Sequence, residues 1–201
     1  ASVMQKNEQP AVGIPIFIGI ELWTGAKSEN KFMSAEIKAS IDSDCIISLF
    51  SPSDIIHSAM LAVDRFYNEE KIKLYVSLKT IDQLSVKGGN ALEYAKSLEK
   101  LPNYMVGTIG ELVWTIGSLA GTFGDAEKNE ILQQKIKRLT RQGVNMRDRQ
   151  IVIDSYWGGM DILLTNDRGL CDDIPANNLR KELGLLIMNP GKLTAYIKNK
   201  L

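Results

Sequence analysis

The sequence has few of the residues on which several common catalytic sites depend. Its 201 residues include two cysteines, Cys45 and Cys171, and a single histidine, His57. No Cys-x-x-Cys pair is present, so a zinc site is not expected. A hydrolase triad would need His57 as its base, and its place in Ile-Ile-His-Ser favours a helix-surface residue instead. Both cysteines stand beside apolar residues, which favours free thiols in a reducing, cytoplasmic setting.

Long hydrophobic runs and an excess of one charge are missing as well. Apolar residues make up 44% of the chain, charged residues make up 24%, and the formal net charge is zero. These values are ordinary for a globular protein with a core, and they argue against a broad basic surface that coats nucleic acid. A local basic patch stays open. The apolar run 11–20 is too short for a bilayer and Glu111 interrupts the run 106–123, so no membrane partner is expected.

Segments typical of strands and of helices alternate along the chain. Apolar and β-branched runs predict strands at 38–49, where the strand is short and ends in an acidic cluster, and at 73–78, 161–165 and 185–188. Periodicity and capping residues predict helices at 53–68, from 80, at 90–100, 108–122, 126–142 and 145–157, and from 192. This alternation predicts an α/β fold with a mostly parallel sheet of four to five strands and helices on both faces.

The first part of the chain has a different pattern from the rest. Residues 1–36 are predicted to be an N-terminal extension, in which 14–23 forms an added strand or one arm of a hairpin. The main domain is expected over residues 37–201.

Three aspartates stand where predicted elements end or begin. Asp42 follows the first predicted strand, Asp148 lies in the first turns of a helix, and Asp167 comes shortly after the strand at 161–165. Ligands of parallel α/β sheets bind beyond the carboxyl ends of the strands. Clustered carboxylates repel one another unless a cation is present, and hard oxygen ligands suit Mg²⁺ or Mn²⁺. We therefore predict a metal site that could cut phosphodiester bonds.

Three segments resemble the PIN-domain family of nucleases, which includes the toxins of many bacterial and archaeal toxin–antitoxin pairs. Residues 41–47 are similar to the family's opening strand, with an aspartate, a second polar residue two positions on, and apolar residues after it. Residues 148–156 are similar to its late helix, which begins with an aspartate. Residues 163–167 are similar to its strand that ends in Thr-x-Asp. The likeness covers roughly residues 37–198.

This resemblance implies a fold, an activity and a set of partners. The expected fold is a PIN-like three-layer sandwich, and the expected activity is that of a metal-dependent endoribonuclease, a cytoplasmic hydrolase that uses Mg²⁺ or Mn²⁺. The resemblance implies Asp42, Asp148 and Asp167 as metal ligands and catalytic residues. The expected partners are RNA, a small antitoxin-like protein and further copies of the same chain.

The sequence departs from the family pattern at the second acidic position. The family usually has a glutamate at the start of the helix after the second strand, and Gln83 stands there with Asp82 beside it. Asp82 is expected to substitute as a catalytic acid through a small backbone shift, and Glu111 is a weaker candidate. Asp44 occupies a position where the family often has asparagine, serine or threonine, which could add a fourth carboxylate.

A basic stretch at 135–149 surrounds one of the aspartates. Its cations are Lys135, Lys137, Arg138, Arg141, Arg147 and Arg149. They form either a solvated helix face or a surface that attracts a phosphate backbone. Arg147 and Arg149 flank Asp148 and are the residues expected near substrate. Thr165 is expected either to hold an aspartate through its hydroxyl or to contact a phosphate.

Two other functions fit parts of the same pattern. A haloacid-dehalogenase-like phosphatase would use Asp42-Ser43-Asp44 as its DxD nucleophile motif and Asp167 with Asp172 as its final acidic pair, but it would leave Asp148 idle. A non-catalytic PIN-like module that binds RNA or a protein is supported by Gln83. Each aspartate taken alone also has a structural interpretation, as a turn residue, a helix charge or a cap.

Overall fold

The computed structural model describes residues 36–101 and 126–200, all of which belong to one unit that spans Ala35–Leu201. The expected strand at 14–23, the expected helix at 108–122 and Glu111 lie outside the described residues. None of the described helices is long and apolar enough to cross a membrane.

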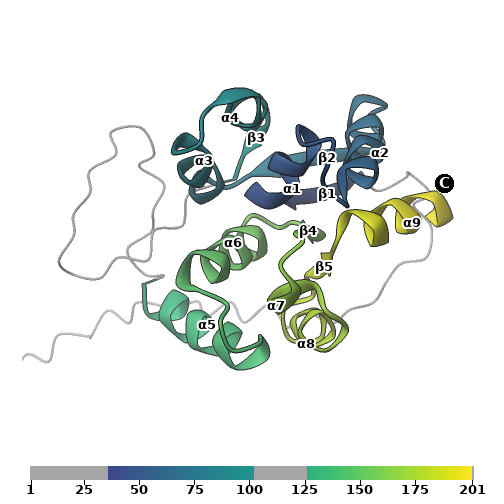
Figure 1. Ribbon diagram of the computed structural model, residues 1–201. Helices are drawn as coiled ribbons and strands as arrows, with labels where there is room; N and C mark the ends of the chain where they lie inside the picture. Colours follow the sequence, from purple (N-terminus) through teal and green to yellow (C-terminus); the bar gives the residue numbers. More distant parts are fainter. Residues whose placement is uncertain (1–35, 102–125, 201) are drawn as a thin grey trace, which may run out of the picture. The chain divides into compact units, whose positions relative to one another are not determined.

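The described residues contain one fully parallel sheet of five strands (Figure 1). The strands are β1 (Ile37–Ile41), β2 (Ile72–Val76), β3 (Glu99–Lys100), β4 (Ile162–Leu164) and β5 (Leu186–Met188). Their order across the sheet is β3-β2-β1-β4-β5, and every neighbouring pair is parallel. This confirms the expected mostly parallel α/β sheet.

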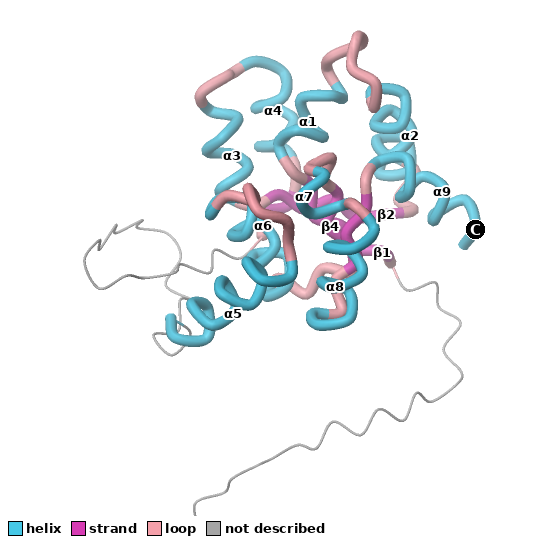
Figure 2. Tube along the Cα trace, turned by 60° about the horizontal axis from the view of Figure 1, so that its bottom comes forward, coloured by secondary structure: helices cyan, strands magenta, loops and turns pink. Residues whose placement is uncertain are grey.

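Helices follow the strands in chain order. They are α1 (Ser43–Leu49), α2 (His57–Asn68), α3 (Leu78–Ser85), α4 (Gly89–Ser97), α5 (Ala126–Leu139), α6 (Met146–Trp157), α7 (Arg168–Cys171), α8 (Asp173–Leu183) and α9 (Pro190–Lys200). Figures 1 and 2 show the helices arranged around the sheet, with α1, α2 and α9 in one group and α5, α6 and α8 in another.

Alternate residues of β2, β4 and β5 contribute to two separate hydrophobic cores. In β4, Ile162 and Leu164 belong to the core shared with α1, α2 and α9, whereas Leu163 between them belongs to the core shared with α5, α6 and α8. The same alternation occurs in β2, where Leu74 and Tyr75 contact different cores. Because successive strand residues point to opposite faces, the sheet is covered on both sides, as a three-layer sandwich requires.

The first predicted strand is shorter than the sequence indicates. β1 ends at Ile41, and residues 43–49 form helix α1 instead of continuing the strand. Asp42 has an extended backbone and its side chain accepts a hydrogen bond from Ser43 N, which makes it the N-cap. Cys45 and Leu49, one helical turn apart, are both buried in the first core. The apolar run therefore packs with helical spacing, which its β-branched composition hid.

Two predicted helix starts are also wrong, by one helical turn in each case. Ser53 does not begin α2, because the next residue, Asp54, belongs to the turn that precedes the helix. The Asp54 carboxylate accepts hydrogen bonds from Ser48 Oγ at 2.7 Å and from Ile56 N at 3.1 Å. α2 consequently begins at His57. Thr80 does not cap α3, since Ser77 Oγ accepts from Thr80 N at 3.1 Å and the helix begins at Leu78.

The helix predicted at 145–157 is confirmed. Asn145 and Asp148 form a reciprocal capping box at its start, and Gly158 ends it. Ser155 of α6 shares a 2.6 Å hydrogen bond with Ser40 of β1, so the helix packs on the centre of the sheet. The sequence did not predict α7, α8 or the two-residue strand β3, and the last helix begins at Pro190, two residues before the predicted start.

The strand order places a crevice at the centre of the sheet. The chain winds outward from β1 through β2 to β3, then returns to the other side of β1 as β4 and continues to β5. Connections that leave β1 and β4 therefore diverge, and such a reversal point is where parallel sheets bind ligands. Asp42 directly follows β1, Thr165 directly follows β4, and Asp42 N donates a 2.9 Å hydrogen bond to Leu164 O. The loops after both strands meet at this point.

Candidate active site: an acidic cleft

Asp42 is fixed at the carboxyl end of β1. Its Oδ1 accepts a hydrogen bond from Ser43 N at 2.6 Å, and its Oδ2 accepts one from Thr165 Oγ1 at 2.8 Å. The residue is 6% exposed. Burial raises the pKa of Asp42 to about 6, helped by the negative charges of Asp44 and Asp148, while the bonds from Thr165 and Ser43 act in the opposite direction. Asp42 is therefore a rigidly held carboxylate in an unfavourable electrostatic setting.

Thr165 couples the two strand ends. Its hydroxyl donates to Asp42 and accepts a 3.1 Å hydrogen bond from Asp167 N, and the residue is fully buried. It holds one aspartate and orients the backbone of another. A direct contact between Thr165 and a phosphate, the other role expected from the sequence, does not fit a side chain without exposed surface.

Asp167 and Asp148 are both held at the starts of helices. Asp167 Oδ1 accepts from Gly169 N at 2.7 Å as the N-cap of α7. Asp148 Oδ2 accepts from Asn145 N at 3.3 Å within the capping box of α6. Partial burial raises the pKa of Asp148, and the charges of Asp167 and Asp44 add to that rise. Helix starts favour negative charge, so each aspartate has a local reason for its position.

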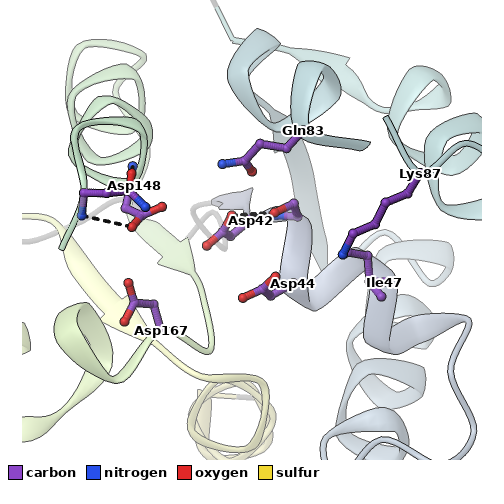
Figure 3. Close-up of a pocket in the computed structure, with 9 residues that line it drawn as sticks. Asp42, Asp44, Ile47, Gln83, Lys87, Asp148 and Asp167 are labelled. Atoms are coloured by element: carbon purple, nitrogen blue, oxygen red, sulfur yellow. Dashed lines mark hydrogen bonds between the residues drawn. The ribbon is translucent and has the colours of Figure 1, made fainter. Parts of the chain in front are cut away.

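These side chains line one cleft of about 420 Å³. Its nine lining residues are Asp42, Ser43, Asp44, Ile47, Gln83, Lys87, Asn145, Asp148 and Asp167. Figure 3 shows Asp148 and Asp167 on one side of the cleft, facing Asp42 and Asp44 on the other. The structure thus brings together the three aspartates singled out in the sequence, and Asp44 with them. We call this feature the acidic cleft.

The helix after β2 contributes Gln83 rather than Asp82. Gln83 lines the cleft and its side chain points into it (Figure 3), whereas Asp82 is exposed and does not line it. Neighbouring residues of a helix point about 100° apart, so α3 can direct only one of the two into the cleft. Gln83 Oε1 is buried and has no hydrogen-bond partner among the described residues.

The negative charge of the cleft is largely uncompensated. Among the described residues, no lysine or arginine forms an ion pair with any of the four cleft aspartates. Lys87 is the one cation among the nine lining residues. Lys87 and Asn145 were not predicted from the sequence. Lys87 lies beyond the end of α3, where no local pattern indicates its direction, whereas Asn145 is the N-cap of α6 and a capping pattern could have indicated it.

The oxygen atoms of the acidic cleft suit a hard divalent cation, although they are not close enough together to form a complete coordination site. Four carboxylates and the unpaired oxygen of Gln83 are the oxygen ligands that Mg²⁺ and Mn²⁺ prefer. Within residues 36–101 and 126–200, no three acidic, histidine or cysteine side chains are grouped closely enough to hold a metal ion. Mg²⁺ usually binds one or two carboxylates directly and keeps several waters. The cleft fits that mode better than a cage made only of protein ligands.

The two expected substrate-binding arginines lie outside the acidic cleft. Arg147 is exposed and does not line it. Arg149 Nη1 donates to Val144 O at 2.6 Å and its Nε donates to Gln133 Oε1 at 3.3 Å, which turns the side chain away from Asp148. Flanking Asp148 in sequence does not place either arginine beside it, because adjacent helical residues face different directions.

Comparison with known proteins adds no family assignment. No protein-family model matches the chain, and no curated protein matches its sequence. The likeness to PIN-domain nucleases therefore rests on the three sequence segments, and functional inference rests on the acidic cleft.

Proposed function

We propose that this chain is a metal-dependent endoribonuclease that cleaves RNA phosphodiester bonds in the acidic cleft. The observation that carries the proposal is the meeting of four aspartates at the reversal point of the sheet with no arginine or lysine paired to them among the described residues. A bound Mg²⁺ or Mn²⁺ would supply a Lewis acid that activates water and offsets the charge of the phosphate. The resemblance of three segments to PIN-domain nucleases supports RNA as the substrate.

The cleft residues have distinct roles in this proposal. Asp42 and Asp167 are the principal cation ligands, since their Thr165 and Gly169 hydrogen bonds hold them rigidly. Asp148 would take the proton from the attacking water, since it lines the cleft on the side that faces Asp42 and Asp44. Lys87 offsets part of the negative charge of the bound phosphate.

A phosphatase that forms an aspartyl-phosphate at Asp42 has less support. Its final acidic pair would need Asp172, which forms a 2.7 Å ion pair with Arg141 and does not line the acidic cleft. Such an enzyme would also have no use for Asp148, which lines the same cleft. The nuclease proposal uses both aspartates.

A binding module without catalysis is the second candidate. Two observations favour it: Gln83 stands where a carboxylate would strengthen a metal site, and the described residues contain no ready group of three metal ligands. In this case the cleft would bind RNA or a protein without cutting a bond. RNA binding without metal-dependent cleavage would distinguish the module from the nuclease.

The test is cleavage of single-stranded RNA in the presence of Mn²⁺, with matched aspartate variants. We expect Asp167→Asn to lower the rate by roughly a hundredfold or more, because a ligand of the activating cation is lost. Asp161→Asn is the control. Asp161 is an exposed aspartate at the opposite end of β4, where it accepts a 2.9 Å hydrogen bond from Lys38 N. This variant should cleave like the wild type.

Three results would contradict the proposal. The first is full activity in excess chelator, and the second is equal activity of the Asp167→Asn and Asp161→Asn proteins. The third is binding of RNA without cleavage at any Mn²⁺ or Mg²⁺ concentration, which would establish the binding module instead. Single-stranded DNA of the same sequence, assayed in parallel, tests whether RNA is the preferred substrate.

A further inference from the structure

A second groove, of about 490 Å³, lies at the turn between α5 and α6. Its lining residues are Gln134, Lys137, Arg138, Thr140, Arg141, Gln142, Gly143, Val144 and Arg149. Four of these nine residues are cations and none is acidic, in a chain whose formal net charge is zero. We call this feature the basic groove.

The four cations differ in how firmly they are held. Arg149 is fixed by Val144 O and Gln133 Oε1, and Arg141 forms a 2.7 Å ion pair with Asp172. The side chains of Lys137 and Arg138 form no ion pair or hydrogen bond among the described residues. The groove therefore combines one preorganised guanidinium with two charges that remain available to an anion.

The backbone of the turn adds two donors. The N–H groups of Gln142 and Gly143 donate to no acceptor among the described residues, and both residues line the groove. Gly143 has φ +107°, a backbone conformation that side chains rarely adopt, and nothing lies within 4 Å of the position a Cβ would take. An anion with several oxygens could accept from this backbone as well as from the cations.

Two of the four charges also have a structural role within α5. Lys137 and Arg138 lie in the last turn of this helix, where cations stabilise the helix by offsetting a partial charge of about −0.5. This partial charge is smaller than the charge of a single cation, so it explains only part of the positive charge in the last turn. It does not explain Arg141 and Arg149, which come from the turn and from α6 and line the same groove.

The basic groove adjoins the acidic cleft. Val144 lines the groove and Asn145, the next residue, lines the cleft, so their Cα atoms are about 3.8 Å apart. Val144 is buried against α7: its Cγ2 lies 2.5 Å from the position that a Cβ on Gly169 would take, and Arg141 N donates to Gly169 O at 3.4 Å. Two consecutive residues of the chain thus line the basic groove and the acidic cleft.

We propose that the basic groove binds backbone phosphates of the RNA strand whose scissile linkage occupies the acidic cleft. The path of the strand into the acidic cleft rests on the proposed function. Binding of RNA by the groove can be measured without cleavage. The RNA strand passes from the groove to the cleft at Val144 and Asn145. The cations of the groove attract the phosphates of the RNA, whereas the aspartates of the acidic cleft alone would repel them.

The test compares two double variants that remove the same charge from the last turn of a helix. Lys137→Gln with Arg138→Gln changes the groove. Lys198→Gln with Lys200→Gln changes α9, which packs on the other face of the sheet. Affinity for a short labelled oligouridylate is measured in chelator over a series of salt concentrations, with circular dichroism to check folding.

We expect the groove variant to bind more weakly and to have a flatter salt dependence. Each phosphate contact contributes about 0.7 to the slope of log K against log salt for single strands, so the loss of two contacts should reduce the slope by about 1.4. The α9 variant should retain the wild-type slope. A groove variant with the wild-type slope, or an equal reduction in both variants, would overturn the proposal.

Two further outcomes identify what the groove binds and whether the bound strand is cut. If poly-glutamate bound as tightly as the oligouridylate and lost affinity in the same groove variant, an acidic protein segment would be the occupant and the RNA assignment would fall. If the wild type bound RNA through the groove but never cleaved it, binding by the groove would stand and the nuclease proposal would fail.

Discussion

At the scale of single residues, Gln83 brings a neutral amide into a cleft in which four of the nine lining residues are aspartates. Its buried Oε1 lacks a hydrogen-bond partner among the described residues, and an unsatisfied buried group costs about 1–3 kcal/mol. A cation or an ordered water at that oxygen would remove the cost. Glutamine at this position still offers an oxygen ligand, but without the charge that would strengthen the binding of a divalent ion.

Replacing this amide with a carboxylate should therefore strengthen metal binding. We expect Gln83→Glu to tighten Mn²⁺ affinity at least about tenfold, because one more negative charge faces the ion at short range. The matched control is Asp82→Asn, the neighbouring residue on the exposed side of α3, which should bind like the wild type. Calorimetric titration of Mn²⁺ into each protein gives both values. Loss of binding in Asp82→Asn with no effect of Gln83→Glu would show that Asp82 is the ligand.

The sequence identified most of the charged residues of the cleft but not how the helices present them. Asp42, Asp148 and Asp167 were evident because they stand at element ends, where a parallel sheet collects ligands. The choice between Asp82 and Gln83 depends on the rotation of α3, which begins at Leu78 and not after Thr80. Arg149 is turned by bonds to a backbone carbonyl and to a residue of α5, contacts that no local pattern reveals.

At the scale of elements, α6 begins where the sequence predicts a helix. Its buried face carries polar side chains that the composition does not indicate. Asp154 is 2% exposed, and its Oδ1 accepts a 2.8 Å hydrogen bond from Gln150 Nε2. Gln133 of α5 donates to Gln150 in turn, at 3.1 Å, so this chain of side chains joins the two helices. Asp154 is therefore a structural residue, and burial raises its pKa to about 6.

A buried carboxyl with a raised pKa makes stability depend on pH in a defined direction. Asp154 contributes stability in its neutral form below the ordinary pKa of 3.8, and that contribution is lost as the pH rises through about 6. Asp154→Asn, which cannot ionise, should therefore gain stability relative to the wild type between about pH 4 and pH 7, by at most about 3 kcal/mol. Urea unfolding across this range checks it. A difference between the two proteins that does not vary with pH would contradict the assigned pKa.

Local patterns predicted elements where capping and periodicity agreed. The helix at 145–157 has an asparagine N-cap and a glycine after it, and the structure has α6 at that place. The run at 43–49 is rich in isoleucine, which favours a strand, but the Asp42 cap and the packing of Cys45 and Leu49 make it α1. Tertiary packing decided the outcome there, as it does for short apolar runs in general.

At the scale of the whole molecule, strand order decides where the charged residues meet. Asp42 and Asp167 are far apart in sequence, and they share a cleft because β4 pairs with β1 and not with β3. The alternation of strands and helices predicted a parallel sheet, but no local pattern specifies which strands are neighbours. The zero net charge likewise conceals an acidic cleft and a basic groove on either side of residues 144 and 145.

The central claim is that the acidic cleft binds a divalent metal, with Asp42 and Asp167 as the principal ligands, and diffraction from crystals soaked in Mn²⁺ tests it most directly. Manganese scatters anomalously, so its position is found without reference to activity or to RNA. We predict an anomalous peak in the acidic cleft within coordination distance of Asp42 or Asp167, with water completing the shell. No peak in the cleft at saturating Mn²⁺, or peaks only at other carboxylates of the surface, would contradict the metal site and the nuclease function proposed from it.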